Sequence, residues 1–269
     1  MLELHRLNAN KAMNFWRLSN KLSFSDFAPG DLLFFLSKDR RDMKNKEKGI
    51  VGFGRVVSMQ QLSLNYMWRK YRQLNGYNSF KEFREAIARC NKNQELPALL
   101  SSFYLEDVTF FQVPIYLSEC GIDVSNRLES YLYLKDERVV MKLLDHAAKA
   151  LDIWSSDESV LARIENLRLV IGINYVQRQI GDPHYEKRLR NRADRHLRKM
   201  EGWQRFKNSA TDIYRLENGQ LHIMMYIDKQ IDIRMLLGQA QLYRRYAAQL
   251  NLGRIQFSLY DPSGKTADL

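Results

Sequence analysis

The chain has 269 residues, of which 45% are hydrophobic and 12% are aromatic, and its formal net charge is +11. This composition excludes a disordered chain and allows two domains with real cores. The positive charge favours a polyanion as the partner, with nucleic acid first among the candidates.

Signals for membranes, export and metals are missing from the sequence. No apolar run approaches the roughly 20 residues that a bilayer requires, and the first residues, MLELHRLNANK, hold no apolar signal core. We therefore expect a cytoplasmic protein without a membrane partner. Cys90 and Cys120 lack metal-like spacing, so we expect no metal, no cofactor and no disulfide scaffold.

The first half of the chain is organised around two apolar runs, residues 32–36 and 50–57, which predict strands. The lysine-rich segment between them, 39–48, is too charged to bury and predicts a loop. Gly52 and Gly54 indicate either a bend or the close approach of another backbone. Ahead of the strands, Trp16 fits a plug at one end of the core, and the alternative is a base-stacking platform.

An insertion with a helical pattern follows the second strand. It covers residues 66–74, breaks at Asn75 and Gly76, and resumes with Ser79 and Glu82 as a capping box for a helix over 81–90. Strand patterns return at 103–115 and at 128–134.

The order of these segments resembles the PUA-like superfamily, in particular its EVE, YTH and ASCH members and the N-terminal domains of some bacterial HNH-type restriction endonucleases. The resemblance is carried by NFW (14–16), PGDLLFFLSK (29–38), GIVGFGRVVS (49–58), MWRKYRQLNGYNSFKEFREAI (67–87), FYLEDVTFFQVPI (103–115) and NRLESYLYL (126–134). It covers just under half of the chain, and no convincing HNH constellation follows.

This resemblance implies a strongly bent β-barrel that holds a flipped, modified base in an aromatic pocket. Trp16 and Phe35 would be the walls. The polar contacts to the base edge would come from Asn14, Ser19, Asn20 and Ser37, and the phosphate contacts from Lys38, Arg40, Arg41 and Lys44.

The middle of the chain predicts two packed helices, over 139–154 and 161–171. A very basic helix is expected over 184–206, because residues 184–207 hold nine Lys or Arg against three Asp or Glu. Its residues Arg190, Arg195 and Arg198 either follow a phosphate backbone or face solvent or another subunit.

The last segment reads as a hairpin over 212–216 and 221–227, a helix over 231–250 and a strand over 254–260. This order resembles PD-(D/E)XK nucleases, and Gln239 and Tyr243 resemble the Gln-x-x-x-Tyr motif of some members. The catalytic candidates are Asp212, Asp228 and Lys229, with Mg²⁺ as the cofactor of that alternative. Asp228 and Lys229 are adjacent and would lie on opposite strand faces, which breaks the metal site unless a bulge realigns them.

We therefore expect an α+β protein with a PUA-like barrel and helical insertion (1–135), a helical connector (136–183) and a small nuclease-like α/β domain (184–269). The leading hypothesis is a non-catalytic protein that reads a modified DNA base in a bacterial or phage restriction or defence setting. One alternative is a Mg²⁺-dependent, modification-dependent endonuclease. The other is a protein-interaction module whose C-terminal helix and hairpin form a homo-oligomer or dock on another subunit.

Overall fold

The computed structural model describes most of the chain and divides it into two compact units. The described residues are 2–18, 30–37, 47–91, 95–122, 131–150, 158–181, 190, 191, 194, 195, 197, 198, 200–206, 209, 211–217, 219–227, 232–253, 255–261 and 266–268. Unit 1 comprises Met1–Tyr133 with Ala150–Asp152, and unit 2 comprises Leu134–Lys149 with Ile153–Leu269. The expected α+β class is confirmed, since both units combine helices with a sheet.

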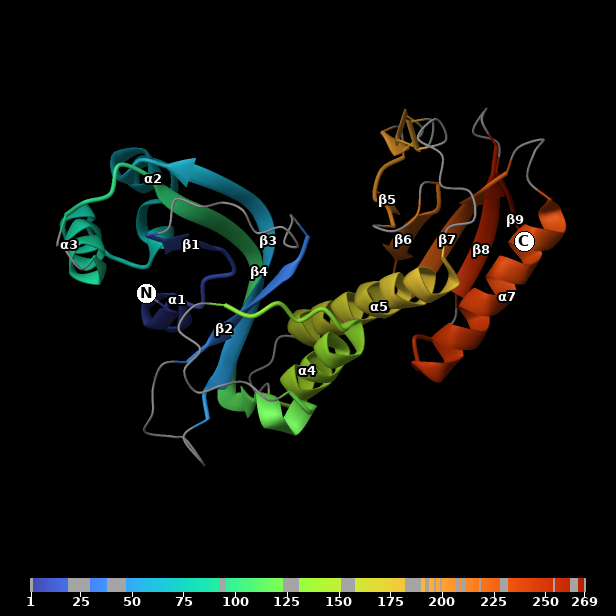
Figure 1. The fold of residues 1–269 in the computed structure, drawn as a ribbon, viewed down its shortest axis with the longest axis horizontal. Helices are drawn as coiled ribbons and strands as arrows, with labels where there is room; N and C mark the ends of the chain where they lie inside the picture. Colours follow the sequence, from blue (N-terminus) through green and yellow to red (C-terminus); the bar gives the residue numbers. More distant parts are fainter. Residues whose placement is uncertain are drawn as a thin grey trace. The chain divides into compact units, whose positions relative to one another are not determined.

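Unit 1 is built on an antiparallel sheet with the order β1-β4-β3-β2 (Figure 1). Its elements are α1 (Leu2–Leu7), β1 (Met13–Arg17), β2 (Leu32–Leu36), β3 (Gly49–Leu62), α2 (Leu64–Tyr71), the 3-10 helix η2 (Arg72–Asn75), α3 (Phe80–Cys90), β4 (Leu100–Tyr116) and the 3-10 helix η3 (Leu117–Cys120). Register shifts interrupt the long β3–β4 pairing, and both strands curve in Figure 1. Within the described residues β1 and β2 are the two edges of this sheet. The strongly bent β-barrel that the resemblance implied stays a prediction.

The two faces of this sheet bury different clusters. On one face, Met13, Phe35, Val56, Phe103, Leu105 and Val108 form a core that Phe15 and Phe110 extend. On the other face, the insertion α2-η2-α3 contributes a second core of Met67, Tyr71, Phe83, Ile87 and Leu100, with Trp16 and Tyr104 against it. Side chains alternate between faces along a strand, so neighbouring residues of β1 belong to different clusters.

The glycine-rich part of β3 reflects the close approach of its neighbour. A Cβ added to Gly52 would lie 2.4 Å from the carbonyl oxygen of Thr109 on β4. Of the two interpretations of these glycines, the close approach of another backbone therefore holds at Gly52. This residue lies next to one of the register shifts between β3 and β4.

Unit 2 contains a mixed sheet with the order β5-β6-β7-β8-β9. Its elements are α4 (Glu137–Ala150), α5 (Glu158–Ile180), β5 (Gln204–Arg205), β6 (Ile213–Glu217), β7 (Gln220–Tyr226), α7 (Ile233–Gln249), β8 (Ile255–Tyr260) and β9 (Thr266–Asp268). The predicted hairpin, helix and third strand are confirmed, with β6 and β7 antiparallel and β7 and β8 parallel. Side chains from α5, α7 and the sheet share the main core of this unit, which includes Ile173, Leu236, Tyr243 and Phe257.

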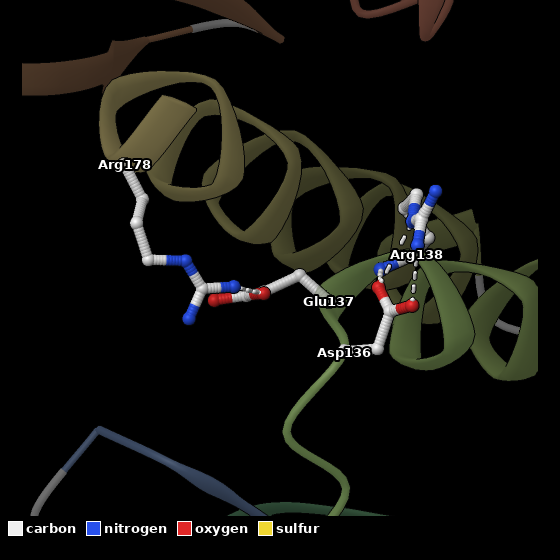
Figure 2. A network of polar contacts seen from close by, with 4 residues as sticks. All are labelled: Asp136, Glu137, Arg138 and Arg178. Carbon is white, nitrogen blue, oxygen red and sulfur yellow. Dashed lines mark hydrogen bonds and ion pairs between the residues drawn. The ribbon is translucent and has the colours of Figure 1, made fainter. Parts of the chain in front are cut away.

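Ion pairs join the helices of unit 2. Asp136 accepts hydrogen bonds from the backbone and guanidinium of Arg138 at the start of α4, and that guanidinium lowers the pKa of the carboxyl (Figure 2). Glu137 pairs with Arg178 on α5. Arg168 on α5 pairs with Asp145 on α4 and donates to the carbonyls of Leu250 and Asn251 at the end of α7. These contacts fix α4, α5 and α7 to one another.

Two sequence predictions about elements need correction. Residues 131–134 are not part of a strand, so the strand predicted over 128–134 is wrong in its described part. The helix predicted over 161–171 is longer, since α5 runs from Glu158 to Ile180. Among the described residues of the basic segment, 190, 191, 194, 195 and 197 are helical.

Candidate nucleic-acid interface

The outer face of α2 gathers cations and an exposed ring. Ser63 caps the helix by accepting the backbone N–H of Tyr66, and Met67 and Tyr71 bury the inner face. With 3.6 residues per turn, the opposite face carries Asn65, Tyr66, Arg69 and Lys70, and all four side chains are exposed. Arg72 is also exposed and follows directly in η2. Because α2 is amphipathic, its cations and the Tyr66 ring lie together on the exposed face.

The cations on this face lie against aromatic rings. The guanidinium carbon of Arg69 is 5.2 Å from the centroid of the Tyr66 ring, and the Lys70 ammonium is 5.0 Å from that of Tyr71. Lys70 also donates to Oε1 of Gln60 on β3 at 2.9 Å. Tyr71 in turn stacks on Tyr104 of β4, with centroids 5.4 Å apart and planes 14° apart. Burial, with the Glu106 carboxylate adding to it, raises the pKa of Tyr104.

The charge around α2 has a single sign in the sequence. Between Glu47 and Glu82 the chain contains Lys48, Arg55, Arg69, Lys70, Arg72 and Lys81 and no Asp or Glu. In the fold, Arg55 of this run pairs with Glu106 and Asp107 on β4, whereas Arg69, Lys70 and Arg72 remain exposed. Exposed cations beside aromatic rings suit phosphates and bases. Sequence reasoning missed this site because it read residues 66–74 only as a helical insertion, although the acid-free run was visible in the sequence.

The structure does not bring together the residues that the resemblance assigned to a base pocket. Phe35 is 3% exposed and its ring stacks 6.5 Å from that of Phe15. Trp16, the next residue on β1, lies on the opposite face, where its indole contacts Phe83 edge-on at 5.7 Å and its Nε1–H donates to the carbonyl of Asn75. Trp16 and Phe35 therefore do not form two walls of one pocket, and Trp16 packs into the core as its alternative interpretation expected.

The polar residues assigned to the base edge are also engaged. Asn14 is fully buried, donates to Oδ1 of Asn75 at 2.8 Å and accepts from the Ser102 hydroxyl at 2.6 Å. The backbone N–H of Ser37 donates to the carbonyl of Gly49. The remaining assigned residues of this half, Ser19, Asn20, Lys38, Arg40, Arg41 and Lys44, lie outside the described residues.

Among its described residues, the basic segment of unit 2 presents two exposed arginines. Arg195 and Arg198 are exposed, and Arg195 donates to the carbonyl of Asn191, whereas Arg190 is half-buried. Asp194 within the same segment pairs with Arg205 on β5 at 3.2 Å. The assignment of phosphate contacts to Arg190, Arg195 and Arg198 stays a prediction.

The buried carboxylate of Asp212 sits between the hairpin and α7. Asp212 is 4% exposed, and its Oδ2 accepts from the Gln239 amide at 3.0 Å and from the Tyr243 hydroxyl at 3.4 Å. The Thr211 hydroxyl donates to its other oxygen. The Gln-x-x-x-Tyr pair found in the sequence therefore does meet the first catalytic candidate.

The described part of the second hairpin strand does not complete a metal site. Extending the β6–β7 register by one residue sets Met225 opposite Asp212, and no acid or lysine occurs in residues 220–227. Asp228 and Lys229 lie outside the described residues. Within the described ranges no group of three His, Cys, Asp or Glu side chains is arranged to hold a metal ion. A hollow of about 350 Å³ lies at the start of β7 and β8, at the opposite end of β7 from Asp212.

Comparisons with known proteins give one structural likeness. No protein-family model matches the chain, and no curated protein matches it. Among solved structures, two point mutants of the ASCH protein from Zymomonas mobilis are each 17% identical at a TM-score of 0.37, covering 54% and 53% of this chain and 91% and 88% of theirs. A further structure of that protein is 16% identical at a TM-score of 0.36, covering 52% of this chain and 87% of its own.

ASCH is one of the groups named by the sequence resemblance, but a superposition at this TM-score does not establish a shared fold. In the part of the chain that the structure describes, no helix has the length and apolarity to cross a membrane.

Proposed function

We propose that this protein binds nucleic acid and that the outer face of α2 contacts the phosphates. The observation that carries the proposal is the set of exposed cations Arg69, Lys70 and Arg72 within one turn, in a stretch of chain free of Asp and Glu. Three neighbouring cations on a rigid helix neutralise two or three successive phosphates and release their counterions. The buried core beneath α2 holds these groups in place.

DNA is the proposed polymer, and a restriction or defence setting is the proposed context, because of the resemblance to the N-terminal domains of restriction endonucleases. Recognition of a modified base belongs to the same proposal. A pocket between Trp16 and Phe35 is not part of it, since these side chains lie on opposite faces of the sheet.

The test compares two triple variants that remove the same charge from unit 1. The first replaces Arg69, Lys70 and Arg72 with Gln. The control replaces Lys81, Arg84 and Arg89 with Gln on α3, where Glu82 and Glu85 interrupt an equally exposed set of cations. Affinity for labelled DNA, with and without modified bases, and for RNA is measured by fluorescence anisotropy over a range of salt concentrations.

The α2 variant is expected to bind at least about tenfold more weakly. Its slope of log affinity against log salt should be shallower by about 2 to 3, because each lost phosphate contact contributes roughly 0.7 to 0.9. The α3 variant should change both quantities much less. Equal losses in the two variants would mean that only net charge matters and would remove α2 as the interface.

A further inference from the structure

Tyr66 differs from the other rings of α2 because its side chain is exposed at the surface. Its side chain is 44% exposed, whereas Tyr71 is 7% exposed and stacks on Tyr104. The third ring, Trp68, packs against Phe80 and Phe83 at 6.0 and 5.8 Å between centroids. The core of unit 1 thus uses two of these rings and leaves Tyr66 to solvent.

The position of Tyr66 links this ring to the cations. It lies one turn before Arg69 and Lys70 on the same helical face, and the Arg69 guanidinium rests over its ring at 5.2 Å. A planar guanidinium on a tyrosine ring forms a rigid, partly apolar platform beside positive charge. This platform has the two properties that an unpaired nucleotide requires, which are a flat surface for the base and a cation within reach of its phosphate.

A duplex does not use such a platform. Its base faces are covered by the neighbouring base pairs, so an exposed ring gains a stacking partner only from an unpaired or extruded base. The cations alone do not discriminate in this way, because both duplexes and single strands carry phosphates. Tyr66 is therefore the group on this surface that is able to distinguish an unpaired strand from a duplex.

We propose that Tyr66 stacks an unpaired nucleobase, so that the α2 surface prefers single-stranded nucleic acid to duplex. This inference rests on the proposed function, since it needs the neighbouring cations to hold the phosphates. It assigns to the outside of the insertion helix the stacking role that the sequence resemblance assigned to a barrel pocket.

The experiment uses the full-length protein with Tyr66→Ala and Tyr66→Phe, and with Tyr131→Ala as the matched control. Tyr131 is 46% exposed and carries the Arg17 guanidinium 5.1 Å from its centroid, so it is a similar arginine-capped ring away from α2. The backbone N–H that caps α2 is retained in both Tyr66 variants, and circular dichroism checks the fold. The probes are a labelled single-stranded oligonucleotide and the duplex of the same sequence.

Tyr66→Ala is expected to weaken single-strand binding by about tenfold or more. It should leave duplex binding and the salt slope within error of the unchanged protein. Tyr66→Phe, which keeps the stacking surface, should stay within about twofold, and so should Tyr131→Ala.

Each other outcome has a defined meaning. Equal effects of Tyr66→Ala on single strand and duplex, or no effect on either, overturn the inference. Loss of binding in the Arg69, Lys70 and Arg72 variant without an effect of Tyr66→Ala overturns the inference alone. Unchanged binding in that triple variant overturns the proposed function itself.

Discussion

At the scale of single residues, buried hydrogen bonds decide which polar side chains remain available for a ligand. Asn14 donates to Asn75, which also donates to the carbonyl of Arg72 at 2.8 Å, and Ser102 donates back to Asn14. This chain of bonds ties β1 and β4 to the turn after α2. The sequence does not distinguish an asparagine that binds a base from one that binds another side chain. Only the fold shows that Asn14 is bonded to Asn75 and Ser102.

We predict that Asn14→Ala lowers the free energy of unfolding by about 3 kcal/mol, because it leaves Asn75 and Ser102 with unsatisfied buried groups. Chemical denaturation measures the loss. The folded variant should bind nucleic acid like the unchanged protein, and an exposed asparagine on α2, replaced in Asn65→Ala, should cost little stability. If Asn14→Ala keeps its stability but binds nucleic acid more weakly, the result would support the earlier hypothesis that Asn14 contacts the base directly.

A second residue-scale prediction concerns His5 on α1. The side chain is fully buried, its Nδ1 lies 3.0 Å from Nδ2 of Asn10, and burial lowers the pKa of His5 from 6.5 to about 4. The unfolded chain therefore binds a proton at a pH where the folded chain does not, and the free energy of unfolding falls as the pH drops from about 6.5 to 4.

The part due to His5 reaches about 3 kcal/mol, at about 1.4 kcal/mol per pH unit. Urea denaturation at a series of pH values measures it, with His5→Gln as the comparison. The difference in stability between the two proteins should shrink steadily toward pH 4. A difference that stays constant across this range would mean that His5 does not titrate in this way.

At the scale of elements, helices with a clear apolar period or a capping residue could be predicted from the sequence. The strand over 128–134 and the order of strands in the sheet could not. Ser79 caps α3 and Glu82 accepts from the backbone of Asn78, in agreement with the predicted capping box. The strand predicted over 128–134 failed at residues 131–134, because alternation of Leu and Tyr describes side chains but supplies no partner strand. The order β1-β4-β3-β2 also depends on long-range pairing that no local pattern specifies.

Helix packing in unit 2 gives a prediction that contrasts two glycines. A Cβ on Gly172 of α5 would lie 2.5 Å from Cδ2 of Leu252, which is 1% exposed, whereas a Cβ on Gly238 of α7 would meet nothing within 4 Å. Gly172→Ala should lower the free energy of unfolding by about 1 to 3 kcal/mol through overpacking. Gly238→Ala should raise it by up to about 1 kcal/mol through helix propensity. Thermal unfolding of both variants measures the contrast, and equal shifts would contradict the close packing of α5 on Leu252.

The contact between α7 and Asp212, which directly precedes β6, gives the other prediction at this scale. Asp212→Ala leaves the donors of Gln239 and Tyr243 without their shared acceptor and should cost about 2 to 4 kcal/mol of stability. Because Asp212 is engaged by neutral donors inside the protein, we expect Mg²⁺ to change neither the melting temperature nor the integrity of bound DNA. A rise in melting temperature with Mg²⁺ that Asp212→Ala abolishes would favour the endonuclease alternative.

At the scale of the whole molecule, the charge of +11 indicated a polyanion but not where it binds. The sequence pointed to a cluster in the basic segment of unit 2, where Arg195 and Arg198 are exposed and their contact with phosphates stays a prediction. The sequence did not single out the cations of α2, because they alternate with leucines, tyrosines and a tryptophan. They gather on one exposed face only after the helix has buried Met67 and Tyr71 on its other side. Composition thus predicts the class of partner, and folding selects the residues that can meet it.

The two clusters should act differently on binding. Tyr66 adds an exposed ring to the cations of α2, whereas Arg195 and Arg198 are proposed to contribute positive charge alone. We therefore predict that replacing Arg195 and Arg198 with Gln weakens single-strand and duplex binding by the same factor and lowers the salt slope by about 1 to 2. Anisotropy titrations measure both, with Lys142→Gln on the exposed side of α4 as the control for charge. If the double variant leaves the slope unchanged, this segment faces solvent or another subunit, and α2 carries the phosphate contacts alone.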